Sequence, residues 1–248
     1  ALDGVSLAVP RGLRTAIVGQ TGSGKSTLVR LMCALEVPDA GHVVVDGIDT
    51  ARKRDRRLVH QRIGYVMQHP ERQLFAQTVA QDVAYGPRNM GLSSPDVDRR
   101  VARALELVGL SDLEEASPFD LSGGQQRLCA IAGILAMRPQ TLVLDEPTNN
   151  LDISNQHRTM HMILDAVRQR GMTTVMTMHD INLAAHYSDA LIFVRDGRLE
   201  AFGGKEVVTS ELVRRVYGID VDVIEHNGRP VIVPAVKQEE GRDAPQGF

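Results

Sequence analysis

The chain has 248 residues, of which 43% are hydrophobic, so it can form one large domain or a domain with a subdomain. Its net charge of -3 gives no strong overall field that would favour nucleic acid or an anionic membrane. No apolar run reaches the roughly 18 residues of a membrane-spanning helix, and no signal peptide is evident, so a role at a membrane would need a partner. The 2 cysteines, Cys33 and Cys129, lie in apolar segments and are expected to be buried free thiols.

Along the chain, short apolar runs alternate with helical patterns. Strands are expected at residues 15–18, 42–46, 63–68, 142–144, 173–177, 191–194 and 199–202. Helices are expected at residues 26–36, 122–137, 157–170 and 182–187, and the stretch from about 78 to 137 is mostly helical. Within that stretch, Ser94 has the character of a helix N-cap, with Pro95 in the first helical position. The alternation predicts an α/β fold: a mostly parallel sheet covered by helices on both faces, with an inserted α-helical subdomain.

The two ends of the chain and one basic segment carry weaker signals. Residues 1–7 resemble the middle of a β-hairpin, so we expect that the true start of the chain is missing. Residues 237–248 are polar and contain Gly and Pro, which predicts a disordered tail. The basic run at residues 52–57 is expected to be a solvated loop or helix face, with a phosphate or membrane-surface patch as the less favoured alternative.

A glycine-rich segment between the first predicted strand and helix fits the pattern G-x-x-x-x-G-K-[ST] without departure. It consists of Gly19, Gln20, Thr21, Gly22, Ser23, Gly24, Lys25, Ser26 and Thr27. Glycines let the backbone N–H groups curl around phosphates, and the following helix directs its positive end at the anion. Lys25 is expected to reach the terminal phosphates and the Ser26 hydroxyl to bind Mg²⁺. A glycine turn that binds nothing would not need this Lys-Ser pair.

Two adjacent carboxylates, Asp145 and Glu146, end the apolar run at residues 142–144. Side by side they would repel each other unless a cation were present. Asp145 is expected to hold Mg²⁺, directly or through water, and Glu146 is the candidate base that polarises the attacking water. A strand-end cap without chemistry is the alternative, and it is weak beside a phosphate loop.

The sequence Leu-Ser-Gly-Gly-Gln at residues 121–125 lies between the phosphate loop and these carboxylates. By chance it would arise about once in a few thousand chains of this length. With the three motifs in this order, the chain resembles the ATP-binding-cassette (ABC) ATPases from about residue 1 to about residue 236. The resemblance implies a P-loop NTPase fold that uses ATP and Mg²⁺. It also implies a RecA-like core at residues 1–77 and 138–236 and a helical subdomain at about 78–137.

The resemblance also implies roles for further residues. Ser122, Gly123, Gly124 and Gln125 would contact the γ-phosphate held by a second ABC subunit, identical or related, in a head-to-tail dimer. Gln68 would sense Mg²⁺ and link to the helical subdomain, although Gln68 taken alone would be interpreted as a surface glutamine at a strand end. Asp152, in Asn150-Leu151-Asp152, would lie in a loop that crosses the dimer interface. His179 would contact the γ-phosphate, although a lone histidine is more often structural.

One element of the family is absent from this sequence. An aromatic residue normally stacks on adenine from a strand before the phosphate loop, and here no Phe, Tyr or Trp precedes Tyr65. We expect the missing N-terminus to have carried it. The preference for adenine therefore depends on the resemblance.

Within the family, two groups compete. Residues 69–87 and 130–139 resemble the energy-coupling-factor group, which imports vitamins and cobalt or nickel ions, whereas residues 151–156, 179–185 and 216–221 resemble ATPases of siderophore, haem and cobalamin importers. We favour the first group: an ATPase at the cytoplasmic face of the cell membrane, docked on a separate integral membrane protein. A soluble ABC ATPase acting on DNA or ribosomes and a non-hydrolysing regulatory cassette are the remaining alternatives, and no nucleic-acid partner is expected.

Overall fold

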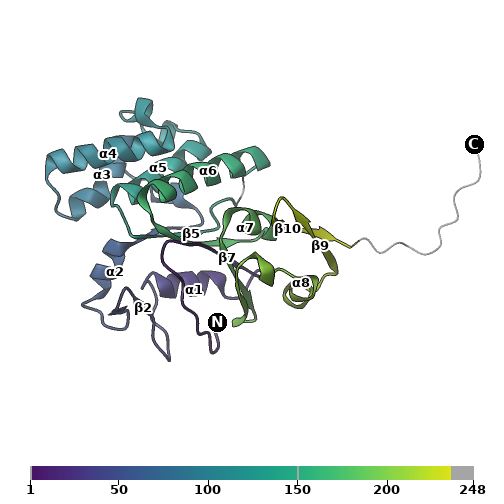
Figure 1. The fold of residues 1–248 in the computed structure, drawn as a ribbon. Helices are drawn as coiled ribbons and strands as arrows, with labels where there is room; N and C mark the ends of the chain where they lie inside the picture. Colours follow the sequence, from purple (N-terminus) through teal and green to yellow (C-terminus); the bar gives the residue numbers. More distant parts are fainter. Residues whose placement is uncertain (1, 150, 236–248) are drawn as a thin grey trace, which may run out of the picture.

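The computed structural model describes residues 2–149 and 151–235 (Figure 1). The tail predicted at residues 237–248 and the position of Asn150 lie outside the described residues. Among the helices described, none is long and apolar enough to cross a membrane.

A six-stranded sheet forms the centre of the molecule. Its order is β4-β5-β6-β1-β7-β8, and every neighbouring pair is parallel except β7 and β8, which are antiparallel. The strands span Arg14–Val18 (β1), Ile63–Val66 (β4), Thr141–Asp145 (β5), Thr173–Met178 (β6), Ala190–Arg195 (β7) and Arg198–Gly203 (β8). The predicted α/β fold with a mostly parallel sheet is therefore confirmed.

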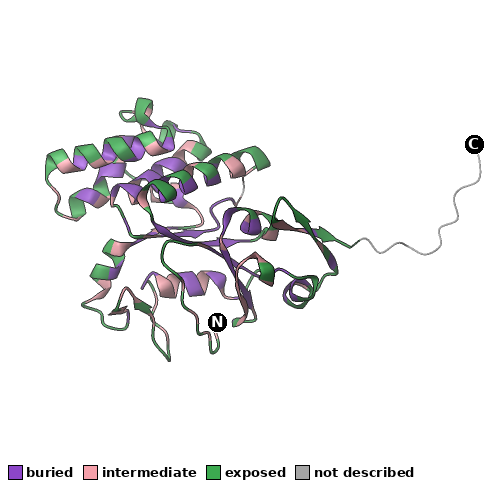
Figure 2. Ribbon diagram, in the orientation of Figure 1, coloured by how far each residue is buried: buried purple, intermediate pink, exposed green. Residues whose placement is uncertain are grey.

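Alternate side chains along the strands enter two separate cores, because successive strand residues point to opposite faces. Leu142 and Leu144 of β5 join the core on one face, while Val143 joins the core on the other. Helices α1 and α2 cover the second face, and helices α3, α4, α5 and α6 lie over the first (Figures 1 and 2). The helices are Lys25–Met32 (α1), Arg56–Arg62 (α2), Val79–Asn89 (α3), Ser94–Val108 (α4), Gly123–Ala136 (α5), Ile153–Arg170 (α6), Ile181–Tyr187 (α7) and Ser210–Tyr217 (α8).

The stretch predicted to be mostly helical contains α3, α4 and α5, which pack on one another. Gly86 in α3 sits against the Met137 side chain, where a Cβ atom would come within 2.6 Å of Cγ, so a larger residue there would displace that side chain. Cys129 in α5 and Cys33 after α1 are both buried and free, as predicted, and burial raises the pKa of each thiol to about 12.

Several local predictions were wrong. Ser93, not Ser94, is the N-cap of α4, because Pro95 is accepted within the first turn and does not mark its first residue. The strand predicted at 42–46 is reduced to a small hairpin, Val44–Val45 (β2) with Ile48–Asp49 (β3). Residues 2–10 contain no strand; their apolar side chains pack beside α1 as irregular chain.

Three further differences concern helix α6 and the segments missed by the sequence analysis. Helix α6 begins at Ile153, earlier than the predicted residue 157, since Asp152 caps it. Helices α2 and α8 were missed; the basic run at 52–57 forms an exposed turn leading into α2. A final hairpin, Val221–His226 (β9) with Arg229–Pro234 (β10), was also missed.

Candidate active site

The glycine-rich segment connects the end of β1 to the start of α1. A Cβ atom on Gly19 would lie 2.1 Å from the carbonyl oxygen of Val194, so only glycine allows the loop to pass β7. Gly22 and Gly24 have φ angles of 82° and 105°, which side chains disfavour. The loop therefore has the backbone freedom that a phosphate-binding turn needs.

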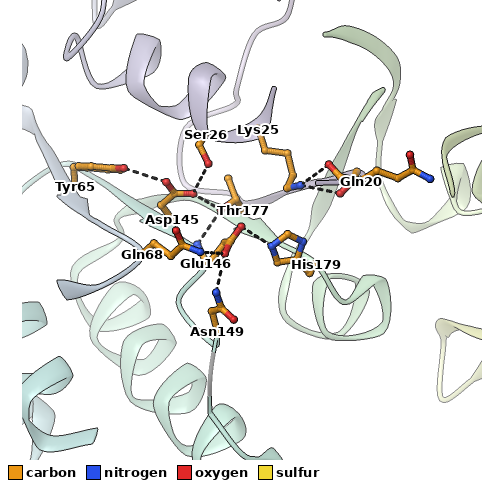
Figure 3. Close-up of polar contacts among 11 residues, drawn as sticks. Gln20, Lys25, Ser26, Tyr65, Gln68, Asp145, Glu146, Asn149, Thr177 and His179 are labelled. Atoms are coloured by element: carbon orange, nitrogen blue, oxygen red, sulfur yellow. Dashed lines mark hydrogen bonds and ion pairs between the residues drawn. The ribbon is translucent and has the colours of Figure 1, made fainter. Parts of the chain in front are cut away.

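Lys25, the first residue of α1, is buried within this loop. Its Nζ donates hydrogen bonds to the carbonyl oxygens of Gly19 at 2.8 Å and Gln20 at 3.0 Å (Figure 3). Burial lowers the pKa of Lys25, and the charges of Glu146 and Asp145 oppose that shift. The Ser23 hydroxyl nearby is buried without a hydrogen-bond partner among the described residues. An ammonium group and a free hydroxyl at a helix start fit the phosphates of a nucleotide.

Asp145 ends β5 and faces three hydroxyl groups. It accepts hydrogen bonds from Thr177 at 2.7 Å, Tyr65 at 3.1 Å and Ser26 at 3.3 Å (Figure 3). A carboxylate beside a serine hydroxyl is an oxygen donor set that suits Mg²⁺, which takes few protein ligands and completes its shell with water and phosphate oxygens. Among the described residues, no cluster of three or more His, Cys, Asp or Glu side chains could hold a metal ion by itself.

Glu146, the next residue, is held by three side chains of its own. Its carboxylate accepts hydrogen bonds from the amides of Gln68 at 2.5 Å and Asn149 at 3.0 Å, and His179 Nε2 lies 2.5 Å from its other oxygen (Figure 3). Its backbone φ of 52° is in the left-handed region, which is strained for a glutamate. Such strain occurs at active sites, where the surrounding structure fixes a functional side chain.

The sheet order explains why residues distant in sequence meet here. Gln68 follows β4, Glu146 follows β5 and His179 follows β6, and these three parallel strands are neighbours. Their carboxyl ends therefore lie at the same edge of the sheet, as do the phosphate loop and α1 after β1. The structure thus brings together the predicted nucleotide, metal and catalytic residues of one chain.

It does not bring the Ser-Gly-Gly-Gln segment into this cluster. Ser122 is the N-cap of α5, and its side chain and that of Gln125 form a capping box with each other. A Cβ atom on Gly123 or Gly124 would meet no atom within 4 Å. Both residues are exposed, so packing within the described chain does not require glycine at either position. Asp152 is likewise exposed and caps α6 by accepting from the Asn155 backbone at 2.9 Å, which lowers the pKa of Asp152.

Sequence reasoning missed four residues that support the site. Thr177 links the Asp145 carboxylate to the Glu146 backbone, donating to Asp145 and accepting from the Glu146 backbone N–H at 2.8 Å. Asn149 and Tyr65 contact Glu146 and Asp145 directly. Arg127 is buried in α5 and donates to the carbonyl oxygens of Pro147 at 3.0 Å and Asn149 at 3.1 Å. A charged residue inside an otherwise uncharged helix was the only sequence signal for Arg127.

Comparison with known proteins shows which family and structures the chain is similar to. The family model described as ABC transporter matches residues 2–149. The chain is 48% identical over 205 residues to the energy-coupling factor transporter ATP-binding protein EcfA2 of Symbiobacterium thermophilum, covering 82% of this chain and 71% of that one. Among solved structures, cbiO1 of Clostridium perfringens, part of the ABC transporter complex cbiONQ, has a TM-score of 0.79 at 36% identity, covering 87% of this chain and 86% of that one.

A second solved structure is a dimer in a post-hydrolysis state. It is the ATP-binding cassette MJ0796 bound to ADP and Pi, with a TM-score of 0.72 at 29% identity, covering 82% of this chain and 90% of that one.

Proposed function

The chain belongs to the ABC transporter family and is an ATPase, and from this premise we propose that it powers import of a small solute through a separate membrane protein. The observation that carries the proposal is the cluster at one sheet edge. There the phosphate-loop Lys25 and the Asp145-Glu146 pair lie together. The similarity to an energy-coupling factor ATP-binding protein favours import over the other activities of ABC ATPases.

Each residue of the cluster has a proposed role. Backbone N–H groups of residues 19–24 and the Lys25 ammonium bind the ATP phosphates, and Ser26 and Asp145 hold Mg²⁺, which neutralises the phosphate oxygens. Glu146 accepts the proton of the attacking water. Gln68, Asn149 and His179 hold the Glu146 carboxylate in place. His179 and Gln68 are also near enough to this carboxylate to respond when a γ-phosphate arrives beside it.

We infer that the working unit is a head-to-tail dimer, with Ser122, Gly123, Gly124 and Gln125 facing the ATP of the partner. The exposure of this segment supports the inference, because its two glycines leave open space at a helix start where a phosphate group could approach. Asp152 would lie in the same interface. In each subunit the core would comprise residues 1–77 and 138–236 and the helical subdomain residues 78–137. The second subunit is a copy of this chain or a related cassette.

Replacing Ser122 by arginine tests the dimer. The bulky cation is expected to stop the helix start from approaching the partner's phosphates, lowering ATP hydrolysis at least about tenfold while ATP binding by the monomer changes less than about twofold. Steady-state ATPase assays and binding of a fluorescent ATP analogue measure the two effects. Ser94→Arg, an equivalent change at an exposed position in α4, is the control and should hydrolyse ATP normally. Full activity of Ser122→Arg would contradict the dimer model.

The membrane partner is proposed to dock beside Gln68, on the segment that leads into α3. Two exposed aromatic side chains support this location: Phe75 and Tyr85 form an edge-to-face pair with ring centroids 4.9 Å apart. Exposed aromatic pairs are common in protein interfaces. The ATPase would then lie at the cytoplasmic face of the membrane, peripherally attached. The solute is proposed to be a vitamin or a transition-metal ion, with an iron-siderophore, haem or cobalamin complex as the alternative.

Affinity capture of the full-length protein from detergent-solubilised native membranes, with mass spectrometry of what is bound, tests this role. Capture of a small multispan coupling protein together with a substrate-binding membrane protein is expected. A Phe75→Glu/Tyr85→Glu variant should lose both, whereas Ile219→Glu, another exposed apolar position, should retain them. A large permease with an extracytoplasmic binding protein would favour the siderophore alternative. Recovery of ribosomes, DNA or no membrane protein would overturn the transport proposal.

A further inference from the structure

A hollow lies at the opposite end of the sheet from the candidate active site. It has a volume of about 660 Å³, within the range of small-molecule sites. Thr141 and Thr173, the first residues of β5 and β6, line it. Glu146 and His179 follow the last residues of the same two strands, so the length of the strands separates the two places.

The lining of this hollow is strongly cationic. Arg11, Arg103, Arg138 and Arg170 line it, against the single carboxylate of Asp46. Asp46 is already shared between Arg11 and, at 4.0 Å, Arg62. The lining therefore has three more guanidinium groups than carboxylates. We refer to it below as the arginine hollow.

Two of these arginines have no acidic partner within the described part of the chain. Arg103 is paired with Glu106 at 2.6 Å, whereas Arg170 bonds to the carbonyl oxygen of Leu135 at 2.6 Å. Arg138 makes no ion pair with any carboxylate in residues 2–149 and 151–235. Arg138 is exposed and Arg170 is half-buried, and the positive charges of Arg138 and Arg103 act on Arg170 around this concave surface.

Capping of α5 explains part of this arrangement. Arg170 and Arg100 donate to carbonyl oxygens at the carboxyl end of α5, where the helix dipole favours cations. The capping bonds use one nitrogen of each guanidinium, which has five N–H donors in all, so most donors are left over. Burial, and then the charge of Arg138, lower the pKa of both Arg100 and Arg170, so the arginines repel one another where they stand.

Capping does not explain Arg138. It follows the C-cap residue of α5 with a φ of 58°, a left-handed position where glycine or asparagine is usual. Asparagine would fit this turn with less strain than arginine. The presence of arginine at a strained position therefore suggests that its guanidinium binds a ligand. Capping needs only the backbone of residue 138, whose N–H bonds to the Leu135 carbonyl oxygen at 3.0 Å.

We propose that the arginine hollow binds a small anion that carries one or more phosphate groups, with Arg138 and Arg170 as its principal ligands. The planar guanidinium fork matches two oxygens of a phosphate, and several forks around one hollow suit a di- or triphosphate chain. The site is separate from the phosphate loop, because it lies at the other end of β5 and β6. A free phosphorylated metabolite and a phospholipid headgroup share this chemistry.

Binding of inorganic tripolyphosphate to the Lys25→Ala protein tests the proposal, since this background removes the phosphate-loop lysine. Isothermal titration calorimetry at low salt is expected to detect one site. Arg138→Asn should weaken that site at least about tenfold, and Arg138→Lys, which keeps the charge and loses the fork, should weaken it less. Asparagine suits the left-handed backbone, so Arg138→Asn is expected to fold at least as stably as its parent. Arg168→Gln, an equal change of charge at an exposed position in α6, is the matched control and should bind within about twofold of the parent.

The results separate the possible outcomes. No tripolyphosphate site in the Lys25→Ala protein, or equal weakening by Arg138→Asn and Arg168→Gln, would overturn the proposal. Flotation with phosphatidylglycerol vesicles distinguishes the sources of phosphate. Loss of vesicle binding in Arg138→Asn, with competition by tripolyphosphate, would support the site and identify a headgroup as the ligand. Vesicle binding that neither Arg138→Asn nor tripolyphosphate reduces, with the calorimetric site intact, would support a free phosphorylated compound as the ligand.

Discussion

Replacing Glu146 by glutamine is expected to slow ATP hydrolysis by about 10²- to 10⁴-fold, the contribution of a positioned general base. The amide keeps the size of the side chain but cannot accept a proton from water. Contacts to Gln68, Asn149 and His179 can persist in part, so the fold should be unaffected. Because binding of ATP uses the phosphate loop, affinity should change little. ATP-loaded subunits that cannot hydrolyse should therefore accumulate as a closed dimer, measurable by size-exclusion chromatography with multi-angle light scattering.

The control for this variant is Glu115→Gln, which makes the same charge change at an exposed position. It should hydrolyse ATP at the wild-type rate and remain monomeric to the same extent as wild type. A Glu146→Gln protein with wild-type turnover would show that another group accepts the proton. A variant that neither binds ATP nor hydrolyses it would instead point to a structural role for Glu146.

Replacing Lys25 by methionine should weaken ATP binding by about 100-fold or more. Hydrogen bonds to charged groups contribute roughly 1.5–3 kcal/mol each, and Lys25 can reach more than one phosphate. Methionine keeps most of the apolar stem of this buried side chain, so the free protein should fold normally. Thermal unfolding with and without Mg-ATP measures both properties in one experiment.

Mass action sets the expected size of the effect. At an ATP concentration 100 times the wild-type Kd, ligand binding stabilises the wild type by about 2.7 kcal/mol, and a variant with a 100-fold larger Kd by only about 0.4 kcal/mol. Lys53→Met, an exposed lysine in the basic turn, is the control and should keep the full stabilisation. An undiminished ATP-induced rise in Tm for Lys25→Met would place the nucleotide elsewhere on the chain.

The strands and helices of the central fold could be predicted because they follow two clear periodicities. Leu142-Val143-Leu144 is apolar on both sides, as a strand buried on both faces must be, and it was found. The hairpin β9–β10 was missed because Val223, Ile224 and Val233 are only partly covered and polar residues interrupt them. The start of α6 was placed too late because Ile153, 75% exposed, gives no core-facing signal, and only the Asp152 cap marks the boundary.

In the candidate site, residues within short motifs could be predicted from the sequence, whereas residues placed by strand register or turn geometry could not. The phosphate loop is one continuous motif and the Asp145-Glu146 pair is another. Their proximity in space follows once a parallel sheet is assumed. Thr177 could not be found this way, because its bonds to the Asp145 carboxylate and the Glu146 backbone depend on the register of β5 against β6, in which Asp145 pairs with Thr177. The contact of Asn149 with Glu146 could not be predicted either, because it depends on the turn after Glu146, in which the Asn149 backbone N–H bonds to the Glu146 carbonyl oxygen at 3.1 Å.

Arg127 couples the position of helix α5 to the residues that hold Glu146. Its guanidinium joins the first half of α5 to the carbonyl oxygens of Pro147 and Asn149. The Asn149 side chain in turn holds the Glu146 carboxylate. A rotation of α5 is therefore expected either to displace the residues after Glu146 or to break the two Arg127 hydrogen bonds, so α5 and the candidate base should move together. If a partner subunit engages the start of α5, as proposed, the same movement would reposition the Glu146 carboxylate.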